Sequence, residues 1–231
     1  SSILRAVEEK KLATKISVFD KSPKVTDYLK KNFSIEICNK ISDVVMDAGK
    51  HIRLYQLWSS GYDKFNCERA SKLGVPVANN GGANCISVAE HTLLLMLACF
   101  RQLPLFHAKT VAGDWSGNSH GMDLFMLQGK TLGVVGFGNI GSAVAERAAA
   151  FGMTILYTDV VPKFPKGPLL TAAKQVQLKE LLQQSDIVTL HMHLNDNTRY
   201  MIGESELSLM RPSAILINVS RAGLVDQRAL T

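Results

Sequence analysis

Gly136-Phe-Gly138-Asn-Ile-Gly141 is the stretch that decides the fold of this chain. It directly follows an apolar run typical of a strand, Thr131–Val135, and directly precedes a run typical of a helix, Ser142–Ala150. Glycines at this spacing are weak evidence alone, but a strand before them and a helix after them make the motif specific for a dinucleotide-binding turn. Gly136 permits the tight turn, Gly138 lets the backbone approach a pyrophosphate, and Gly141 lets the helix pack closely on the strand.

The start of the predicted helix supplies the other half of such a site. Free backbone N–H groups and the helix dipole favour an anion at that point. We therefore predict that the cofactor-binding residues of the turn are Gly136, Gly138, Asn139, Ile140 and Gly141.

The next predicted strand, Met153–Thr158, ends in Asp159, eighteen residues after Gly141. A carboxylate there can accept hydrogen bonds from the adenosine ribose hydroxyls of NAD, and it would repel the 2′-phosphate of NADP. The alternative is a cap or turn residue, since Val-Val-Pro follows. The glycine motif upstream favours the cofactor interpretation, so we expect NAD rather than NADP.

The composition is that of an ordinary globular protein. The chain has 231 residues, 46% of them hydrophobic and 20% charged, which is enough for one or two domains. The net charge of +6 is mildly basic. The lysine pairs are isolated and no basic stripe with interleaved aromatics occurs, which argues against nucleic-acid binding.

The cysteines indicate a reducing compartment, and the apolar runs argue against a membrane span. The four cysteines show neither C-x-x-C pairing nor metal-ligand spacing, so we expect free thiols and no metal site. The run Leu93–Phe100 is too short to span a bilayer, and the N-terminus lacks a secretory signal pattern. We therefore expect a cytoplasmic protein with no membrane partner.

Predicted strands alternate with predicted helices in two segments joined by a long helix over 87–101, a pattern typical of parallel βαβ units. The strands are expected at 15–20, 33–38, 52–58 and 75–78, then at 131–135, 154–158, 175–177, 186–191 and 214–219. The helices are expected at 23–31, 42–50 and 67–73, then at 142–151, 178–184 and 204–210.

Several blocks of this chain resemble the D-isomer-specific 2-hydroxyacid dehydrogenase family, in the family's order. The blocks lie at 59–63 (SSGYD), 88–92 (VAEHT), 113–115 (GDW), 130–141 (KTLGVVGFGNIG), 185–191 (SDIVTLH) and 217–226 (INVSRAGLVD). The resemblance implies an α/β protein with a Rossmann-type doubly wound parallel sheet domain at 102–231, truncated at its C-terminus. It also implies a smaller flavodoxin-like α/β substrate domain at 1–101, which is incomplete.

The resemblance also implies an activity. Family members are NAD-dependent oxidoreductases that reduce 2-oxo acids or oxidise D-2-hydroxy acids, and relatives act on formate, phosphoglycerate, glyoxylate, hydroxypyruvate and phosphite. Such chemistry needs a site for the substrate carboxylate and a cation for the charge that develops on the C2 oxygen. It also needs an acid/base for the hydroxyl proton while hydride passes to or from nicotinamide C4.

Arg221 fits the cation, because it follows a predicted strand end, where open α/β sheets place their ligands. The family's catalytic arginine occupies the corresponding place, and the resemblance sets Val219, Ser220 and Arg221 beside the cofactor. The alternative is an ordinary surface arginine. Ser60 and Gly61 match the family's substrate-carboxylate loop, where backbone N–H groups would bind the anion; the alternative there is simply a turn.

Two histidines, His191 and His193, could face the same way on a strand, as two zinc ligands might, but no third ligand is evident nearby. The resemblance places His191 beside the cofactor. His193 stands where relatives usually carry proline, which puts the shape of that loop in doubt. His91, on the long apolar helix, is better explained as a hydrogen-bonded core or cofactor-side residue than as an acid/base.

The family completes its active site with a glutamate and then a histidine downstream of the arginine. Ten residues follow Arg221, and none is Glu or His. We therefore expect the 231 residues to bind NADH weakly and to turn over negligibly. The alternative function is a non-catalytic NAD-binding interaction protein that resembles the C-terminal-binding-protein corepressors. A generic Rossmann protein such as a methyltransferase is disfavoured by Asp159 together with the Arg221 block.

We also expect a homodimer, from the resemblance and from the apolar run Leu93–Phe100 beside Arg101–Phe106. The alternative is that this run is merely the buried helix between the two lobes. The expected partners are thus a second copy of the chain and a small 2-oxo or 2-hydroxy acid.

Overall fold

The computed structural model describes the backbone of 16–18 and 35–37 and, with side chains, residues 52–57, 59–63, 65–115, 124–163, 165 and 167–231. The contacts divide the chain into two compact units, Ser1–Asn80 and Gly81–Thr231. The helices predicted over 23–31 and 42–50 lie outside the described residues.

The first unit contains two pairs of parallel strands. Strand β1 (Ile16–Val18) pairs with β2 (Ile35–Ile37), and β3 (Tyr55–Gln56) pairs with β4 (Val77–Ala78). All four strands were predicted, although the third is much shorter than the expected 52–58. Helix α4 (Cys67–Lys72) lies between β3 and β4, as predicted.

The ends of α4 follow from its sequence. Its N-cap residue, Asn66, accepts a hydrogen bond from the Arg69 N–H at 2.9 Å. Gly74 follows the helix with φ +68°, a left-handed conformation that glycine adopts without strain. The helix expected over 67–73 therefore ends just before Gly74.

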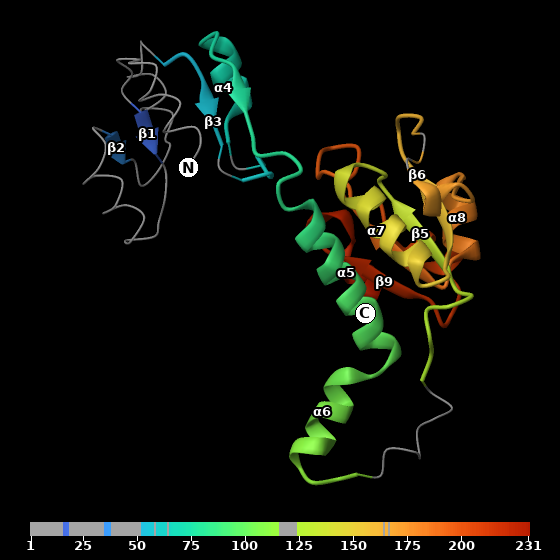
Figure 1. Cartoon of the computed structure of the whole chain (residues 1–231). Helices are drawn as coiled ribbons and strands as arrows, with labels where there is room; N and C mark the ends of the chain where they lie inside the picture. The colour runs from blue at the N-terminus through green and yellow to red at the C-terminus, as the bar shows by residue number, and fades with distance from the viewer. Residues whose placement is uncertain are drawn as a thin grey trace. The chain divides into compact units, whose positions relative to one another are not determined.

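The second unit is built on a five-stranded, all-parallel sheet in the order β7-β6-β5-β8-β9 (Figure 1). The strands are β5 (Thr131–Val135), β6 (Thr154–Thr158), β7 (Lys174–Gln175), β8 (Ile187–Leu190) and β9 (Ile215–Asn218). The chain winds outward from β5 in both directions, so the strand order reverses between β5 and β8. This arrangement confirms the predicted Rossmann-type doubly wound sheet.

Helices cover both faces of this sheet. One core cluster joins α5 (Cys85–Phe100) and α7 (Asn139–Ala150) to the sheet, and a second joins α8 (Leu178–Gln184) and α9 (Glu204–Leu209) to its other face. Short 3-10 turns η2, η3 and η4 span Pro168–Leu170, Ala222–Leu224 and Gln227–Leu230. The last turn is capped by Asp226, whose Oδ1 accepts a hydrogen bond from the Arg228 N–H at 3.0 Å.

The middle strand shows why both faces need a cover. Leu132 and Val134 belong to the first core cluster, whereas Val135 belongs to the second. Successive side chains of a strand point to opposite faces, so a strand covered on both faces is apolar throughout. Gly133 lies between Leu132 and Val134 in this strand, and a Cβ there would collide with side-chain atoms of Ser185 and Leu181. The glycine therefore lets α8 approach the strand closely.

Helix α5 packs against α7, and this contact places the boundary between the compact units after Asn80 rather than after residue 101. The assignment of 1–101 and 102–231 to two functional domains stays a prediction. Helix α7 begins at Asn139, not at 142 as expected.

Helix α6 (Leu103–Val111) was not predicted. Gln102 adopts a left-handed conformation with φ 48°, which ends α5, and Pro104 is tolerated in the first turn of the new helix. In the part of the chain that the structure describes, no single helix is long and apolar enough to cross a membrane. Together α5 and α6 would pass that test, but a 66° bend separates them.

Candidate cofactor-binding site

The three motif glycines meet different constraints. Gly136 has φ +92°, and a Cβ there would lie 2.8 Å from the carbonyl oxygen of His191. A Cβ on Gly141 would collide with the carbonyl oxygen of Gly136. A Cβ on Gly138 would meet no atom within 4 Å. The fold therefore requires the first and third glycines, whereas the space above the second is open for a ligand.

The start of α7 is free to bind an anion. Its N-cap, Gly138, offers no side-chain hydrogen bond, and the first turn contains no acidic residue. The first N–H groups of a helix have no partner within the helix, and the dipole there favours negative charge. The predicted turn residues Gly138 and Asn139 are exposed, and Ile140 is half-buried. Together they fit the pyrophosphate of a dinucleotide.

Asp159 lies immediately after β6, and its carboxylate is already bonded twice. Oδ2 accepts a hydrogen bond from the Phe137 N–H at 2.8 Å, and Oδ1 accepts one from the Val161 N–H at 3.0 Å. The bond to Val161 stabilises the turn after β6, which is the alternative role that the sequence left open for Asp159. The first bond joins the carboxylate to the glycine turn. Binding of the ribose by Asp159 stays a prediction.

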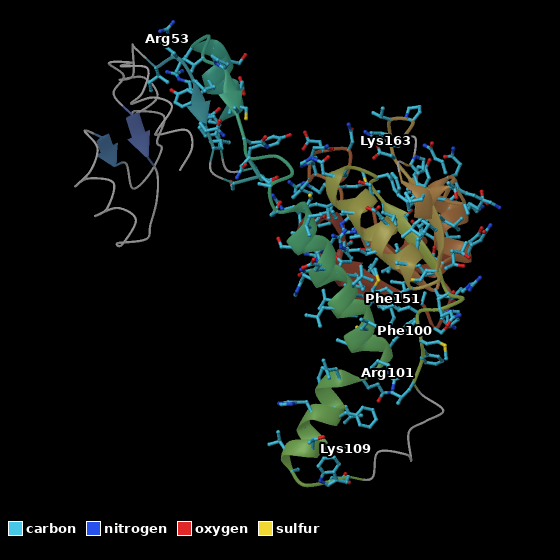
Figure 2. All side chains as sticks on the ribbon, viewed as in Figure 1. Arg53, Phe100, Arg101, Lys109, Phe151 and Lys163 are labelled. Atoms are coloured by element: carbon cyan, nitrogen blue, oxygen red, sulfur yellow. The ribbon has the colours of Figure 1, made fainter. Side chains whose placement is uncertain are left out.

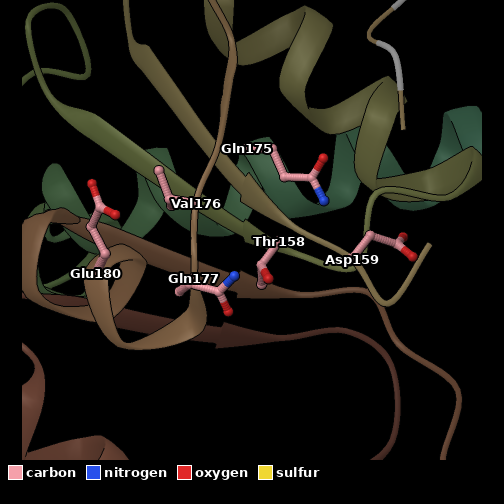
Figure 3. A pocket seen from close by; sticks show the side chains of 6 residues that line it. All are labelled: Thr158, Asp159, Gln175, Val176, Gln177 and Glu180. Atoms are coloured by element: carbon pink, nitrogen blue, oxygen red, sulfur yellow. The ribbon is translucent and has the colours of Figure 1, made fainter. Parts of the chain in front are cut away.

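Two hollows adjoin this connection. The larger, of about 440 Å³, is lined by side chains from the ends of β6 and β7 and the start of α8 (Figure 3): Thr158, Asp159, Gln175, Val176, Gln177 and Glu180. The smaller, of about 290 Å³, is lined by Phe137, Gly138, Asn139, Ser142, Ala143, Glu146 and Lys163. Lys163 lies on the loop that follows β6 (Figure 2). Asp159 lines the first hollow, and its bonding partner Phe137 lines the second.

His191 lies where the sheet reverses its order. Its N–H donates to the carbonyl of Val135 at 2.8 Å, which joins the end of β8 to the end of β5. Its Nε2 is 3.0 Å from the Thr189 hydroxyl, whereas Nδ1 is buried and has no partner among the described residues. Burial lowers the pKa of His191 from 6.5 to about 4, so the ring is neutral at pH 7. An orphaned polar atom at this edge fits a site that a bound group completes.

His193 is exposed, whereas His191 is half-buried, and β8 already ends at Leu190. Within the residues that the structure describes, no group of three potential metal ligands occurs. The loop after His193 is held without a proline. The Thr198 hydroxyl donates to the His193 carbonyl at 2.7 Å and accepts from the Asn195 N–H at 2.8 Å.

Arg221 follows β9 at the same edge of the sheet. The Asn218 side chain holds the turn, since its Nδ2 donates to the Arg221 carbonyl at 2.9 Å and its Oδ1 accepts from the Ser220 N–H at 3.1 Å. The Ser220 hydroxyl donates to the carbonyl of Leu190 at 2.8 Å, which ties this turn to the end of β8. The sequence interpretation gave Asn218 no role, although it lies within the quoted block. Val219 is half-buried against the first core cluster.

Ser60 and Gly61 lie in a turn of the first unit. The Ser59 hydroxyl donates to the carbonyl of Gly61 at 2.6 Å, and the Asn79 side chain donates to the carbonyl of Ser60 at 2.7 Å. Both bonds use carbonyl oxygens of the turn as acceptors, so they consume none of its backbone N–H groups. Binding of a substrate carboxylate by those groups stays a prediction.

The glycine turn, His191 and Arg221 thus follow three neighbouring strands at one edge of a doubly wound sheet. A family model described as D-isomer specific 2-hydroxyacid dehydrogenase, NAD binding domain, matches residues 93–231. The chain belongs to this family. NAD is the cofactor of the matched domain, and the open space at Gly138 and the uncapped start of α7 fit it.

Curated relatives agree with the family model. The chain is 37% identical over 199 residues to a glyoxylate reductase from Thermococcus litoralis, covering 84% of this chain and 60% of the relative. It is 35% identical over 197 residues to a hydroxypyruvate reductase from Thermotoga maritima, covering 85% of this chain and 62% of the relative. The chain therefore spans about three fifths of the length of these relatives.

Solved structures are similar as well. A protein called TT0316 from Thermus thermophilus has a TM-score of 0.78 at 30% identity, covering 93% of this chain and 76% of that one. A D-lactate dehydrogenase from Aquifex aeolicus, solved with NAD and lactic acid, has a TM-score of 0.78 at 28% identity. It is matched over 93% of this chain and 72% of its own.

The glycine geometry predicts that two substitutions of the same size act differently. Gly138→Ala should leave the melting temperature nearly unchanged, because its Cβ meets no protein atom within 4 Å. It should weaken NADH binding by about tenfold or more, because the methyl group enters the space of the pyrophosphate. Gly141→Ala should instead lower the melting temperature, since its Cβ collides with the Gly136 carbonyl. Calorimetry and NADH titration of both variants check this, and equal melting temperatures would contradict it.

The buried His191 predicts a loss of stability in acid. Its pKa of about 4 lies below the unfolded value of 6.5, so the unfolded chain binds the proton more strongly. The stability contribution is fully present above pH 6.5 and is lost as pH falls toward 4, by up to about 3 kcal/mol. His191→Gln should give a shallower decrease over this range in urea titrations at several pH values. Parallel decreases for the two proteins would rule out His191 as the cause.

Proposed function

We propose that this chain belongs to an enzyme that transfers hydride between NAD(H) and a small D-2-hydroxy acid or 2-oxo acid. One observation carries the proposal: Arg221 follows β9, directly beside the strand end where His191 marks the reversal of strand order. A guanidinium at that edge can hold a substrate carboxylate and carbonyl together. The names of the glyoxylate and hydroxypyruvate reductases support a small 2-oxo acid as substrate.

NAD, when bound, supplies or accepts the hydride at nicotinamide C4. Arg221 stabilises the negative charge that develops on the C2 oxygen. Binding of an acid's carboxylate by the backbone N–H groups of the Ser60–Gly61 turn stays a prediction from the sequence. His191 is neutral at pH 7, so it adds no positive charge at this edge. Residues 222–231 contain neither Glu nor His, so no residue of this sequence is assigned the proton at the C2 oxygen.

The proposal predicts that the 231 residues bind NADH but turn over 2-oxo acids very slowly. The 231 residues should bind NADH weakly and reduce glyoxylate or hydroxypyruvate very slowly, since lack of an acid/base typically costs about 10²–10⁴-fold. Appending the segment that follows the matched region in the Thermococcus litoralis glyoxylate reductase should restore turnover. Arg221→Ala in that chimera should abolish most of it, with NADH binding largely kept.

Absorbance of NADH at its nicotinamide band measures this turnover, and fluorescence measures the binding. Fast reduction by the 231-residue chain would show that the acid/base is misplaced, and His91 and His191 would then be tested first. A chimera that binds NADH but reduces neither acid would favour the non-catalytic interaction protein instead.

We further propose a cytoplasmic homodimer. The described cysteines Cys67, Cys85 and Cys99 are free thiols, which suits a reducing compartment. The apolar run on α5 is divided: Leu93, Met96 and Phe100 are buried, whereas Leu94 is exposed. The buried part supports the alternative of a simple core helix, so the dimer proposal rests on the exposed part and on α6.

Helix α6 buries none of its residues, and Leu103, Leu105 and Val111 are 52%, 43% and 75% exposed. Figure 2 shows Arg101 where α5 meets α6 and Lys109 farther along α6. Exposed apolar side chains gathered on one element are typical of a protein interface.

Light scattering at micromolar concentrations should therefore give the mass of a dimer. Leu105→Glu should shift it toward monomer, because a charge would be buried in the interface. Leu169→Glu, at a similarly exposed leucine on η2, is the matched control and should leave the mass unchanged. A monomer at every concentration would remove the proposal.

A further inference from the structure

Asp159 connects two loops that are remote in sequence. Its carboxylate accepts from the N–H of Phe137, in the glycine turn, and from the N–H of Val161, in the loop after β6. Both bonds have ordinary lengths, 2.8 and 3.0 Å, and the residue is half-buried. Bonds to an ionised acceptor are stronger than neutral ones. The carboxylate is therefore a structural connection in the cofactor-free protein.

Besides the Asp159 bond, a backbone hydrogen bond and a ring contact also connect the glycine turn to β6. The Gly136 N–H donates to the carbonyl of Thr158 at 2.9 Å. The Phe137 ring is buried and lies 4.1 Å from the ring of Tyr157, measured between centroids. The Tyr157 hydroxyl in turn donates to the carbonyl of Lys163 at 2.8 Å, which fixes the loop after β6. Turn and loop are thus held to one strand by backbone, carboxylate and ring contacts.

The Phe137 N–H is the last point at which this strand holds the turn before α7 begins. The next residue, Gly138, is the N-cap of α7 and has no side chain, so it brings no capping bond of its own. The N–H groups that would face the pyrophosphate follow immediately in the chain. Their direction depends on how firmly the peptide before Gly138 is held.

We infer that Asp159 is a positioning residue for the pyrophosphate as well as a partner of the adenosine ribose. By holding Phe137, its carboxylate sets the turn before the cofactor arrives. The two roles are compatible, because an ionised carboxylate has about four acceptor positions and the two backbone bonds use one on each oxygen. Ribose and pyrophosphate recognition are then linked through one side chain.

This inference rests on the NAD-binding part of the proposed function and not on the substrate. It differs from simple ribose recognition in what a substitution at Asp159 does to a cofactor without ribose hydroxyls. We therefore compare NADH with its analogue that lacks the adenosine 2′- and 3′-hydroxyls. If Asp159 only binds hydroxyls, Asp159→Ala affects NADH and leaves the analogue unchanged. If it also sets the turn, the analogue weakens as well.

The matched control is Asp186, whose Oδ2 accepts from the Thr131 N–H at 2.8 Å at the other end of β5. It is the same residue type accepting a backbone N–H bond, at the end of β5 opposite the cofactor site, and its Oδ1 also pairs with Arg211 at 2.9 Å. Asp186→Ala reports what the loss of such a bond does to the domain as a whole. Asp159→Asn is an intermediate variant, because an amide has one oxygen and can keep only one of the two backbone bonds.

The experiment measures dissociation constants by NADH fluorescence and amide exchange of Phe137 in the cofactor-free protein. Asp159→Ala should weaken the dideoxy analogue by about tenfold or more and NADH further, and it should speed Phe137 exchange by about tenfold or more. Asp159→Asn should give smaller changes in each. Asp186→Ala should leave the binding of the analogue and the exchange of Phe137 within about twofold.

The inference is overturned if Asp159→Ala binds the analogue as tightly as the unsubstituted protein does. It is also overturned if Phe137 exchange is unchanged, a measurement in the free protein that holds whether or not the chain acts on 2-oxo acids. Equal effects of Asp159→Ala and Asp186→Ala would assign the loss to general destabilisation and would likewise overturn it. Asp159→Ala should also narrow the preference for NADH over NADPH, because it removes both the ribose contacts and the repulsion of the 2′-phosphate.

Discussion

The close approach of Gly141 to the carbonyl of Gly136 is the contact on which the cofactor edge depends. A Cβ at Gly141 would collide with that oxygen, so α7 can begin directly over the end of β5 only because the residue is glycine. The same approach seats Val144 and Ala148 in the core against the sheet. Helix position, core packing and the placement of the first N–H groups therefore share one steric requirement.

The strand ends are then joined by further hydrogen bonds: two backbone bonds continue a strand pairing by one residue, and one side-chain bond links the turn after β9 to β8. The Gly136 N–H reaches Thr158, the His191 N–H reaches Val135, and the Ser220 hydroxyl reaches Leu190. The candidate site residues Gly138, His191 and Arg221 lie at these bonds or within two residues of them. The backbone around these residues is therefore held by hydrogen bonds, and a site built this way needs little ordering when a ligand binds.

The sequence was most informative where one local pattern determines the structure. Strands β5 and β6 and helix α8 occupy the predicted residues, because apolar runs bounded by turn residues specify them without reference to distant parts. The start of α7 was predicted three residues late, because the helix was expected only after the last motif glycine, Gly141, whereas the structure uses Gly138 as the N-cap. Helix α6 was missed because its separation from α5 depends on the left-handed Gln102.

The candidate site residues were proposed from motifs, but their interactions could not be predicted. The bond between Asp159 and the Phe137 N–H joins positions 22 residues apart and depends on the register of β5 with β6. The burial of His191, which makes the ring neutral, depends on packing that no short pattern encodes. Asn218 was overlooked because a side chain that bonds only its own turn has no distinctive spacing.

The empty volume above Gly138 bears on how this protein could change over time. The folded backbone leaves no room for a side chain at Gly136 or Gly141, so any descendant that keeps this sheet must keep glycine at both positions. At Gly138 a Cβ would meet no protein atom within 4 Å, so only the proposed cofactor would restrict this position. A lineage that stopped using the dinucleotide would be released from that demand at this one position first, with its fold intact. The proposed ligand thus constrains Gly138, whereas the backbone of the fold constrains Gly136 and Gly141.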